Sequence, residues 1–382
     1  MTAERHTDVI IIGGGIGGLA AGIALRQAGL TVAVFERTPV WEAVGAGLSL
    51  WPNAMYALQK LGLGTPMAAL GTPQADAVIR TWRGEPLSCL PASEMARRFG
   101  SPLIGIHRAD LQHILLDALG ADAIHLGAEC VGIEEHTTGV RVTFADGSCA
   151  EGAALIGADG LRSAVRAHLW GSAPPRYAGY TAWRGVTLGG AQTIAGEWWG
   201  RGVRFGAVPL SEGRVYWFAS VTTPEGGADP PGERKKTLLQ LFAGWDAPVL
   251  ALIAATGEAA ILRNDIYDRS PLPRWGRGRV TLLGDAAHPM TPNLGQGAGQ
   301  ALEDAVVLGA CLGASSDPAS ALRAYEERRR ARTAAVVRQS RLFGQLAQSE
   351  RHPVCWLRDA LFRWTPTRLQ FRQLRRFAGY RV

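Results

Sequence analysis

Cysteine is scarce in this chain of 382 residues, and long apolar runs are missing. The five cysteines are dispersed, form no Cys-x-x-Cys pair and are odd in number. This pattern predicts reduced thiols of a cytoplasmic protein and excludes a disulfide framework or a structural zinc site. No apolar run approaches the roughly 20 residues that span a bilayer, so we expect no integral membrane segment. Residues 1–7 are short and polar and lead directly into a strand, which predicts no signal peptide.

Positive and negative charges balance over residues 1–350. Residues 351–382 contain eight arginines and one acidic residue, Asp359, and so carry the whole net charge of +7. One interpretation is a pair of C-terminal helices whose apolar side chains pack on the body while the arginines face water. The apolar residues in question are Trp356, Leu357, Leu361, Phe362, Leu369, Phe371, Leu374 and Phe377. The alternative is an arm that contacts a membrane surface or a nucleic acid. We favour the first and expect no nucleic-acid partner, because no nucleic-acid-binding motif accompanies the arginines.

The chain opens with a strand at 8–12, a glycine loop at 13–18, a helix at 19–28 and a second strand at 31–35, which is a βαβ pattern. From residue 176 the character changes. The segments 180–188, 196–199, 203–208 and 214–221 alternate between apolar and polar residues and are rich in aromatics, which predicts an antiparallel sheet. A helix is expected over 233–254 and a long one over 320–348. The strand at 280–283 then returns to the first domain.

This order predicts an α/β fold in which a Rossmann-like dinucleotide-binding domain contains an inserted, mostly antiparallel β-sheet substrate domain, followed by C-terminal helices. We assign residues 1–75, 101–175 and 275–318 to the dinucleotide domain. Residues 76–100 and 176–274 form the substrate domain, and residues 319–382 form the C-terminal helices with the arginine-rich tail. A monomer or a homodimer fits this organisation.

Gly13-Gly14-Gly15-Ile16-Gly17-Gly18 is a GxGxxG fingerprint between a strand and a helix. Gly13, Gly15 and Gly18 permit a tight turn and the close approach of a pyrophosphate to the helix N-terminus. Glu36, at the tip of the second strand, is placed to accept ribose hydroxyls, and Arg37 is either an adenine neighbour or a solvent residue. The fingerprint occurs once, so the sole tightly held dinucleotide is NAD, or it is FAD with any nicotinamide bound transiently elsewhere.

A second motif favours FAD. Leu283-Gly284-Asp285 closes an apolar strand, and a turn with Pro292 and Gly295 leads to a helix that starts at Gly297. A carboxylate and a helix N-terminus are thereby brought to the carboxyl end of a strand, where open α/β sheets bind ligands. Asp285 can accept hydrogen bonds from a polyol, and the helix N-terminus suits a group that becomes anionic. Reduced flavin on its ribityl chain has both properties. His288 lies in the same loop and reads as a packing histidine rather than a base.

A third motif, Gly157-Ala158-Asp159-Gly160-Leu161-Arg162-Ser163, joins a strand to a helix, with Ser163 as a candidate N-cap. By itself it could be a turn in which Asp159 binds local backbone.

Together these three segments resemble the class A flavoprotein monooxygenases, the para-hydroxybenzoate hydroxylase-like group, and they occur in family order between residues 8 and 309. The resemblance implies that the glycine fingerprint binds the ADP half of FAD. It implies that Asp159-Gly160 with Arg162 serves the FAD pyrophosphate and NAD(P)H, and that Gly284-Asp285 holds the ribityl chain. Arg108 matches the family arginine that contacts FAD near its phosphates.

The resemblance also implies a reaction. NAD(P)H, a transient co-substrate, reduces the bound FAD, O2 gives a flavin C4a-hydroperoxide, and one oxygen atom passes to a small aromatic or polyene substrate by hydroxylation or epoxidation. No nucleophile or metal is required of the protein, and the chain has neither a Ser-His-Asp pattern nor a metal-binding cluster. A flavin dehydrogenase or reductase on the same fold and a non-catalytic flavin-binding protein are the alternatives.

Two stretches, 49–53 and 290–297, resemble the urate hydroxylase and zeaxanthin epoxidase branch. Arg204 and Tyr216 fall where the urate enzymes place substrate-contacting residues, although both could be ordinary sheet residues. The urate enzymes carry an acid where this chain has Asn293. The missing carboxylate removes a base or an arginine partner, which argues against urate as the substrate.

Overall fold

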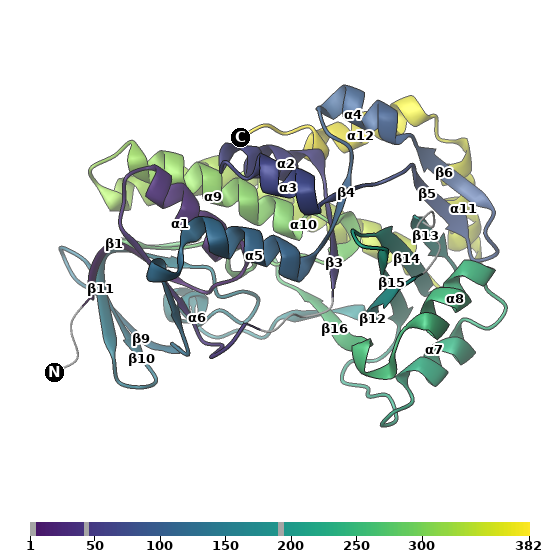
Figure 1. Ribbon diagram of the computed structural model, residues 1–382, viewed down its shortest axis with the longest axis horizontal. Coiled ribbons are helices and arrows are strands. Elements are labelled where there is room, and N and C mark those ends of the chain that lie inside the picture. The colour runs from purple at the N-terminus through teal and green to yellow at the C-terminus, as the bar shows by residue number, and fades with distance from the viewer. Residues whose placement is uncertain (1–4, 42–45, 190–194) are drawn as a thin grey trace.

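Two large β-sheets, a small third sheet and the helices around them form the molecule (Figure 1). The computed structural model describes residues 5–41, 46–189 and 195–382. The first sheet has the order β8 (Ile124–Leu126), β2 (Val32–Glu36), β1 (Arg5–Ile12), β11 (Cys149–Gly157), β10 (Val140–Phe144) and β9 (Cys130–Glu135), with β17 (Val280–Leu282) also beside β11. β1 pairs in parallel with β2 and β11, and β17 pairs in parallel with β11. The carboxyl ends of these four strands therefore meet at one edge.

The second sheet has the order β16 (Leu262–Asp268), β12 (Arg176–Leu188), β15 (Arg214–Thr222), β14 (Val203–Pro209), β13 (Gly196–Trp199), β5 (Ala77–Thr81) and β6 (Pro86–Leu90). Only the β13–β5 pairing among these is parallel. A small sheet of β3 (Gly47–Leu50), β7 (Ile104–His107) and β4 (Thr72–Pro73) completes the strands of the described residues. The predicted α/β fold with a mostly antiparallel second sheet is confirmed, whereas the exact domain boundaries stay a prediction.

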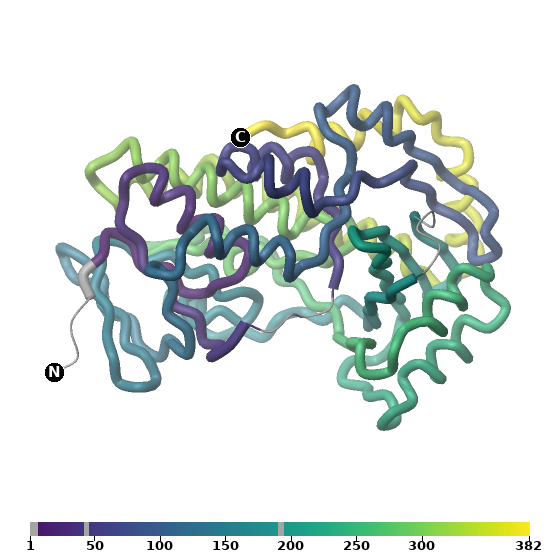
Figure 2. Tube along the Cα trace, viewed as in Figure 1, coloured from purple at the N-terminus to yellow at the C-terminus, as the bar shows by residue number. Residues whose placement is uncertain are grey.

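The helices of the first half are α1 (Ile16–Gln27), α2 (Pro52–Lys60), α3 (Gly64–Leu70), α4 (Ala92–Phe99), α5 (Arg108–Leu119) and α6 (Ala164–Trp170). Those of the second half are α7 (Arg234–Leu241), α8 (Ala247–Ala255), α9 (Gly297–Gly313), α10 (Pro318–Ala347), α11 (His352–Trp364) and α12 (Thr367–Ala378). The long helix α10 links the two halves of the molecule, and the trace in Figure 2 brings the C-terminal segment back beside β6 and α4. No helix in the described ranges is long and apolar enough to cross a bilayer.

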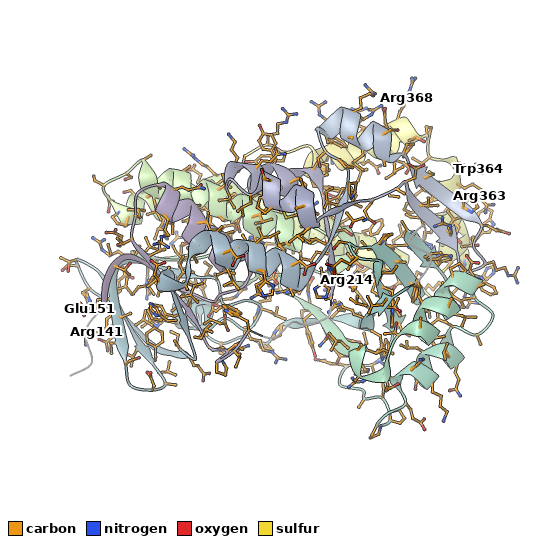
Figure 3. All side chains as sticks on the ribbon, viewed as in Figure 1. Arg141, Glu151, Arg214, Arg363, Trp364 and Arg368 are labelled. Carbon is orange, nitrogen blue, oxygen red and sulfur yellow. The ribbon has the colours of Figure 1, made fainter. Side chains whose placement is uncertain are left out.

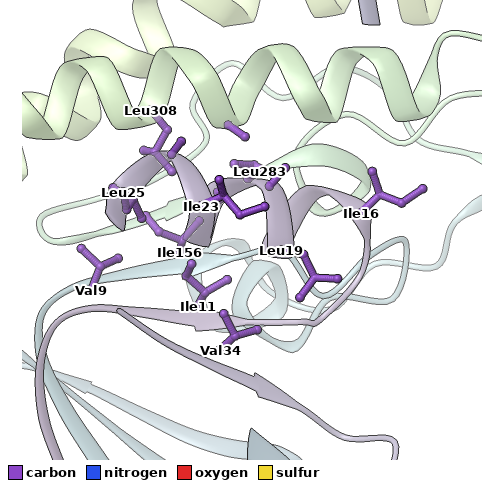
Figure 4. Close-up of a cluster of buried hydrophobic side chains, with 14 of the residues drawn as sticks. Val9, Ile11, Ile16, Leu19, Ile23, Leu25, Val34, Ile156, Leu283 and Leu308 are labelled. Atoms are coloured by element: carbon purple, nitrogen blue, oxygen red, sulfur yellow. The ribbon is translucent and has the colours of Figure 1, made fainter. Parts of the chain in front are cut away.

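The core of the first domain lies between the parallel strands and α1. Figure 4 shows Val9, Ile11, Val34 and Ile156 from three neighbouring strands packed beneath the apolar side of α1. α9 covers α1 at close range, since a Cβ added to Gly309 would lie 2.8 Å from the Cβ of Ala24. Small residues at this crossing let the two backbones approach, which fixes where the N-terminus of each helix points.

The second core lies on one face of the second sheet. Side chains alternate along β15, so Val215, Trp217 and Ala219 pack with α7 and α8 around Phe242. Tyr216, Phe218 and Ser220 therefore face the opposite side, which we call the inner face.

Two sequence-based expectations are wrong. The helix expected over 233–254 is two helices, because Gly244 adopts a left-handed φ of +80° and Pro248 starts a new helix. In the C-terminal segment, Phe371 and Phe377 are buried as expected, but Trp356, Leu357, Leu361 and Leu369 are exposed. Arg358 is buried instead of facing water.

Candidate active site

The three glycine-containing motifs lie together at the carboxyl edge of the first sheet. Ala158 N donates to Ile12 O at 2.7 Å, and Leu283 N donates to Gly157 O at 2.9 Å, so neighbouring backbones carry the motifs in register. A Cβ on Gly13, whose φ is +107°, would lie 2.4 Å from the carbonyl oxygen of Ala158. The first glycine of the fingerprint is therefore required by contact with the third motif.

The glycine loop leaves the start of α1 accessible. A Cβ on Gly18 would lie 1.9 Å from the oxygen of Gly13, so only glycine fits inside the loop. In contrast, a Cβ on Gly15 would meet nothing within 4 Å. Within residues 5–41, 46–189 and 195–382, no side chain caps α1, whose N-cap is Gly15. Free N–H groups next to open space are the features that a pyrophosphate needs.

Glu36 holds the same loop. Its Oε2 accepts a hydrogen bond from Gly14 N at 2.7 Å, and its Oε1 accepts bonds from Thr38 N and Thr38 Oγ1 at 3.0 and 2.9 Å. An ionised carboxylate has about four lone-pair sites, so roughly one remains for a ligand hydroxyl. Arg37 beside it is exposed to solvent.

Asp159 binds local backbone, which is one of the two roles that the sequence allowed for it. Its Oδ2 accepts from Ala164 N and Val165 N at 2.7 and 3.2 Å, at the start of α6. Ser163 is the N-cap, as expected, and accepts from Arg166 N at 2.8 Å. Asp159 Oδ1 is buried and has no hydrogen-bond partner in the described part of the chain, and burial raises the pKa of this carboxyl. Gly160 has a φ of +78° with open space where a side chain would be.

Arg166 ties this turn to the Gly284-Asp285 turn, and the sequence analysis missed it. Its buried Nη1 donates to Ala286 O at 3.1 Å and to Ala287 O at 3.3 Å. Burial lowers the pKa of Arg166 to about 10.

Asp285 is accessible but closely surrounded by protein. Its side chain reaches solvent, and no hydrogen bond to it is found within the described residues. Burial raises the pKa of the Asp285 carboxyl, while the charges of His288 and Arg108 oppose this effect. A carboxylate with free acceptors in a recess can bind ligand hydroxyls. Arg108, at the first position of α5, is exposed and is close enough for its charge to act on Asp285.

The backbone at the start of α9 is open to close contact with a ligand. Pro292 begins a tight turn that ends at Gly295, whose φ is +58°. Among the residues that the structure describes, no side chain caps α9, and a Cβ on Gly297 would meet nothing within 4 Å. The buried side chain of Gln296 accepts from Asn53 Nδ2 at 3.0 Å, which anchors the turn to α2. The first N–H groups of α9 are thus left for a ligand.

A buried charge cluster supports α9 from behind. Arg329 of α10 donates from Nε to Asp304 at 2.6 Å and from Nη1 to Glu303, and all three side chains are fully buried. Arg332 also binds Glu303, at 2.7 Å, and His288 Nε2 lies 2.5 Å from Asp304 Oδ2. Sequence reasoning missed this cluster, although it identified His288 as a packing histidine.

The cluster also contacts the Gly284-Asp285 turn directly. Asp304 Oδ2 accepts from Gly284 N at 3.1 Å, and Asn53 donates to Glu303 at 2.7 Å. Burial opposes ionisation of Asp304, but His288 and Arg329 outweigh it and hold the pKa of this carboxyl below its usual range. The cluster therefore fixes both Asp285 and the start of α9.

Arg204 and Asn293 meet on the inner face of the second sheet. Arg204 is 2% exposed, donates from Nη2 to Asn293 Oδ1 at 2.6 Å, and donates from Nε to Gln348 Oε1 at 2.5 Å. Tyr180 OH also donates to Asn293 Oδ1, at 3.2 Å. The nearest carboxylate is Glu197, whose Oε2 is 3.8 Å from Arg204 Nη1. The hydrogen bonds of this buried guanidinium go mainly to neutral amides, which do not balance its positive charge. The guanidinium can therefore bind an anionic partner.

Tyr216 lies on the same face and closes it against the first domain. A Cβ on Gly47 would lie 2.4 Å from the Cβ of Tyr216, and one on Gly206 would lie 2.2 Å from the ring of Phe218. The Phe218 ring thus lies across Gly206, between Arg204 and Tyr216 in the register of β14 and β15. Burial raises the pKa of Tyr216. This surface combines Arg204 with the rings of Tyr180, Tyr216 and Phe218, and Arg184 of β12 lies beside Tyr216.

No group of three or more His, Cys, Asp or Glu side chains that could hold a metal occurs in the part of the chain described by the structure. The open positions at Gly15 and Gly297, the two uncapped helices and the free acceptors of Asp285 instead match the phosphate, polyol and ring parts of FAD.

Comparison with known proteins agrees with this fit. The family described as FAD binding domain matches residues 6–340. An aurachin C monooxygenase/isomerase from Stigmatella aurantiaca is 48% identical, covering 93% of both chains. An FAD-dependent urate hydroxylase from Klebsiella pneumoniae is 41% identical over 84% of this chain and 85% of its own. A 3-amino-4-hydroxybenzoate 2-monooxygenase from Streptomyces cremeus is 37% identical over 96% and 94%.

Among solved structures, Klebsiella pneumoniae HpxO complexed with FAD and uric acid superposes with a TM-score of 0.92 at 36% identity, covering 98% of this chain and 96% of its own. The family match spans most of the chain, and the relatives named above are covered over 85% to 96% of their own length. The chain belongs to the class A FAD-dependent monooxygenases.

Proposed function

We propose that the enzyme uses NAD(P)H and O2 to insert one oxygen atom into a small aromatic substrate that carries an acidic hydroxyl or another anionic oxygen. The observation that carries this proposal is the buried Arg204 beside the neutral Asn293 on a face lined by aromatic rings. FAD, when bound and reduced, supplies the chemistry that activates O2. The named relatives act on aurachin C, urate and 3-amino-4-hydroxybenzoate, which supports oxygenation of a ring compound.

The cofactor would be held by the edge of the first sheet. The start of α1 and the loop from Gly13 to Gly18 would bind the pyrophosphate, and Glu36 would accept one ribose hydroxyl. Asp285 would accept hydroxyls of the ribityl chain, and Arg108 would contact the phosphates. The N–H groups at Gly297 would face the ring edge that gains negative charge on reduction.

Arg204 would bind the substrate oxygen and favour its ionised form, because a nearby positive charge lowers the pKa of an acid. An ionised ring hydroxyl makes the ring carbons electron-rich and so more reactive towards an electrophilic oxygen. Asn293 would fix the guanidinium without neutralising it. Tyr216 and Phe218 would pack against the ring and help to exclude water.

A ligand screen tests this function. Purified holoenzyme is mixed with NADH or NADPH and a panel of hydroxylated aromatic compounds, and the oxidation of the nicotinamide is followed together with the mass of the product. We expect that the substrate stimulates nicotinamide oxidation and that the product is heavier than the substrate by one oxygen atom. Arg204→Met should raise KM for the substrate by about one hundredfold if the lost contact is a charge-assisted bond worth roughly 3 kcal/mol, whereas the nearby exposed Arg201→Met should not. Cofactor oxidation without any oxygenated product would instead indicate a flavin reductase.

A further inference from the structure

The outward side of α11 exposes a group of large apolar side chains. Trp356, Leu357, Leu361 and Trp364 are 68%, 63%, 56% and 81% exposed, and Leu369 at the start of α12 is 45% exposed. We call these five residues the α11 apolar surface. The other large apolar residues exposed in the described ranges are scattered singly along the chain. Clustered exposed apolar side chains mark an interaction site, whereas single ones do not.

The orientation of α11 is fixed from its other side. At 100° per residue, the exposed residues of α11 occupy an arc of roughly 140°. The opposite side is buried, with Cys355 at 5% and Arg358 at 2% exposure. The ring of Phe362 packs 4.9 Å from that of Trp199, and Arg358 donates to Gly200 O and Ala347 O. The helix therefore cannot turn its apolar side inward without breaking these contacts.

Arginines predominate among the charges of α11 and the start of α12, next to the α11 apolar surface. Arg351, Arg363, Arg368 and Arg372 are exposed, whereas Arg381 lies beyond the other end of α12, over the ring of Tyr56. Figure 3 shows Arg363 and Trp364 together at one border of the molecule, with Arg368 above them. The single acid of the segment, Asp359, is paired with Arg358 at 2.8 Å. Arg363 also has an exposed contact with Glu85 at 3.6 Å, which stabilises little.

We propose that this surface docks the enzyme on the face of a bilayer that contains anionic phospholipids. Tryptophan and leucine side chains would enter the boundary between headgroups and acyl chains, where amphipathic rings are favoured. The exposed arginines would contact lipid phosphates. A second copy of the chain fits less well, since a two-fold contact would bring each arginine-rich rim against itself. The charge pattern thus selects an anionic partner.

Docking would also place the second sheet near the lipid. α11 packs on Trp199, and Trp199 is the cross-strand partner of Arg204 in the pairing of β13 with β14. The inner face would then lie one helix away from the bilayer. The proposal itself depends on the exposed surface alone and not on the identity of the substrate.

Vesicle flotation of the flavin-loaded enzyme tests this inference. Vesicles of phosphatidylcholine alone are compared with vesicles in which about a third of the lipid is phosphatidylglycerol. We expect binding to the anionic vesicles, weaker binding at high salt, and at least about tenfold weaker binding to neutral vesicles.

Two variants localise the contact. Trp356→Ser combined with Trp364→Ser removes exposed side chains and should weaken vesicle binding at least about tenfold while bound flavin stays unchanged. Trp170→Ser, at a 40% exposed tryptophan outside the α11 apolar surface, is the matched control and should bind as the unaltered enzyme does. Absence of binding to anionic vesicles would overturn the proposal. Equal binding by the double variant would also overturn it, as would a dimer that the double variant abolishes.

Discussion

Replacing Arg329 by methionine tests the buried charge cluster behind α9. Arg329 donates to Asp304, to Glu303 and to Gln300, and its side chain is fully buried. Removing it leaves two buried carboxylates with one positive partner fewer. Breaking a buried ion pair in this way typically costs about 3–5 kcal/mol.

The remaining partners set the expected magnitude. Glu303 keeps Arg332, and Asp304 keeps His288, so neither carboxylate is left alone. We therefore expect a loss near the lower limit, about 3 kcal/mol of the free energy of unfolding. This loss is a large part of the roughly 5–15 kcal/mol that stabilises a typical domain. It corresponds to an approximately hundredfold change in the unfolding equilibrium.

Urea unfolding at saturating FAD measures this loss, with Arg328→Met as the control. Arg328 is the preceding residue on α10 and is exposed, so its replacement should change stability by less than about 0.5 kcal/mol. Combining Arg329→Met with Glu303→Gln and Asp304→Asn removes the two buried negative charges that Arg329 balanced and should recover part of the loss. If Arg329→Met unfolds at the same urea concentration as the control, the stabilising role assigned to the cluster is wrong.

Three further predictions concern the site. Gly18→Ala would place a Cβ 1.9 Å from the oxygen of Gly13, so the purified variant should lack FAD absorbance, whereas Gly64→Ala on the surface of α3 should retain it. Asn293→Asp would put a carboxylate against Arg204, so kcat/KM for an anionic substrate should fall by at least about tenfold. An unchanged kcat/KM would show that Arg204 does not bind the substrate. Because the folded state holds the pKa of Asp304 below its usual value, its ionisation stabilises the fold above about pH 4, and this contribution is lost as pH falls through the lower folded-state pKa. Asp304→Asn should remove that part of the pH dependence in acid unfolding, and an unaltered acid transition would contradict the assignment.

The three motifs at the carboxyl edge of the first sheet could be predicted from the sequence because local geometry dictates their residues. Only glycine fits at positions 13 and 18, where an added Cβ would lie 2.4 and 1.9 Å from a backbone oxygen. Ser163 could be predicted for a similar reason, because an N-cap side chain accepts a hydrogen bond from a backbone N–H only three residues further along the chain. The parallel register then brings motifs that are more than 100 residues apart in sequence to one edge.

Long-range partners could not be predicted. Arg329 and Arg358 look like solvated residues of basic helices, and only the packing of α10 and α11 shows that both are buried. The sequence predicted that the apolar side chains of α11 pack on the body, which is wrong for Trp356, Leu357 and Leu361. The covered side of this helix depends on where Trp199 lies. Asp159 appeared to be a cofactor ligand, yet its hydrogen bonds cap α6. The role of Asp159 towards FAD or NAD(P)H therefore stays a prediction.

Oxygen isotope incorporation tests the central claim most directly. The holoenzyme is supplied with NADH or NADPH, the substrate found in the ligand screen and oxygen gas enriched in oxygen-18. We predict that each product molecule gains one labelled oxygen atom and that one reduced nicotinamide is consumed for each product formed. Nicotinamide oxidation that yields only hydrogen peroxide, or a product whose added oxygen comes from water, would contradict the account.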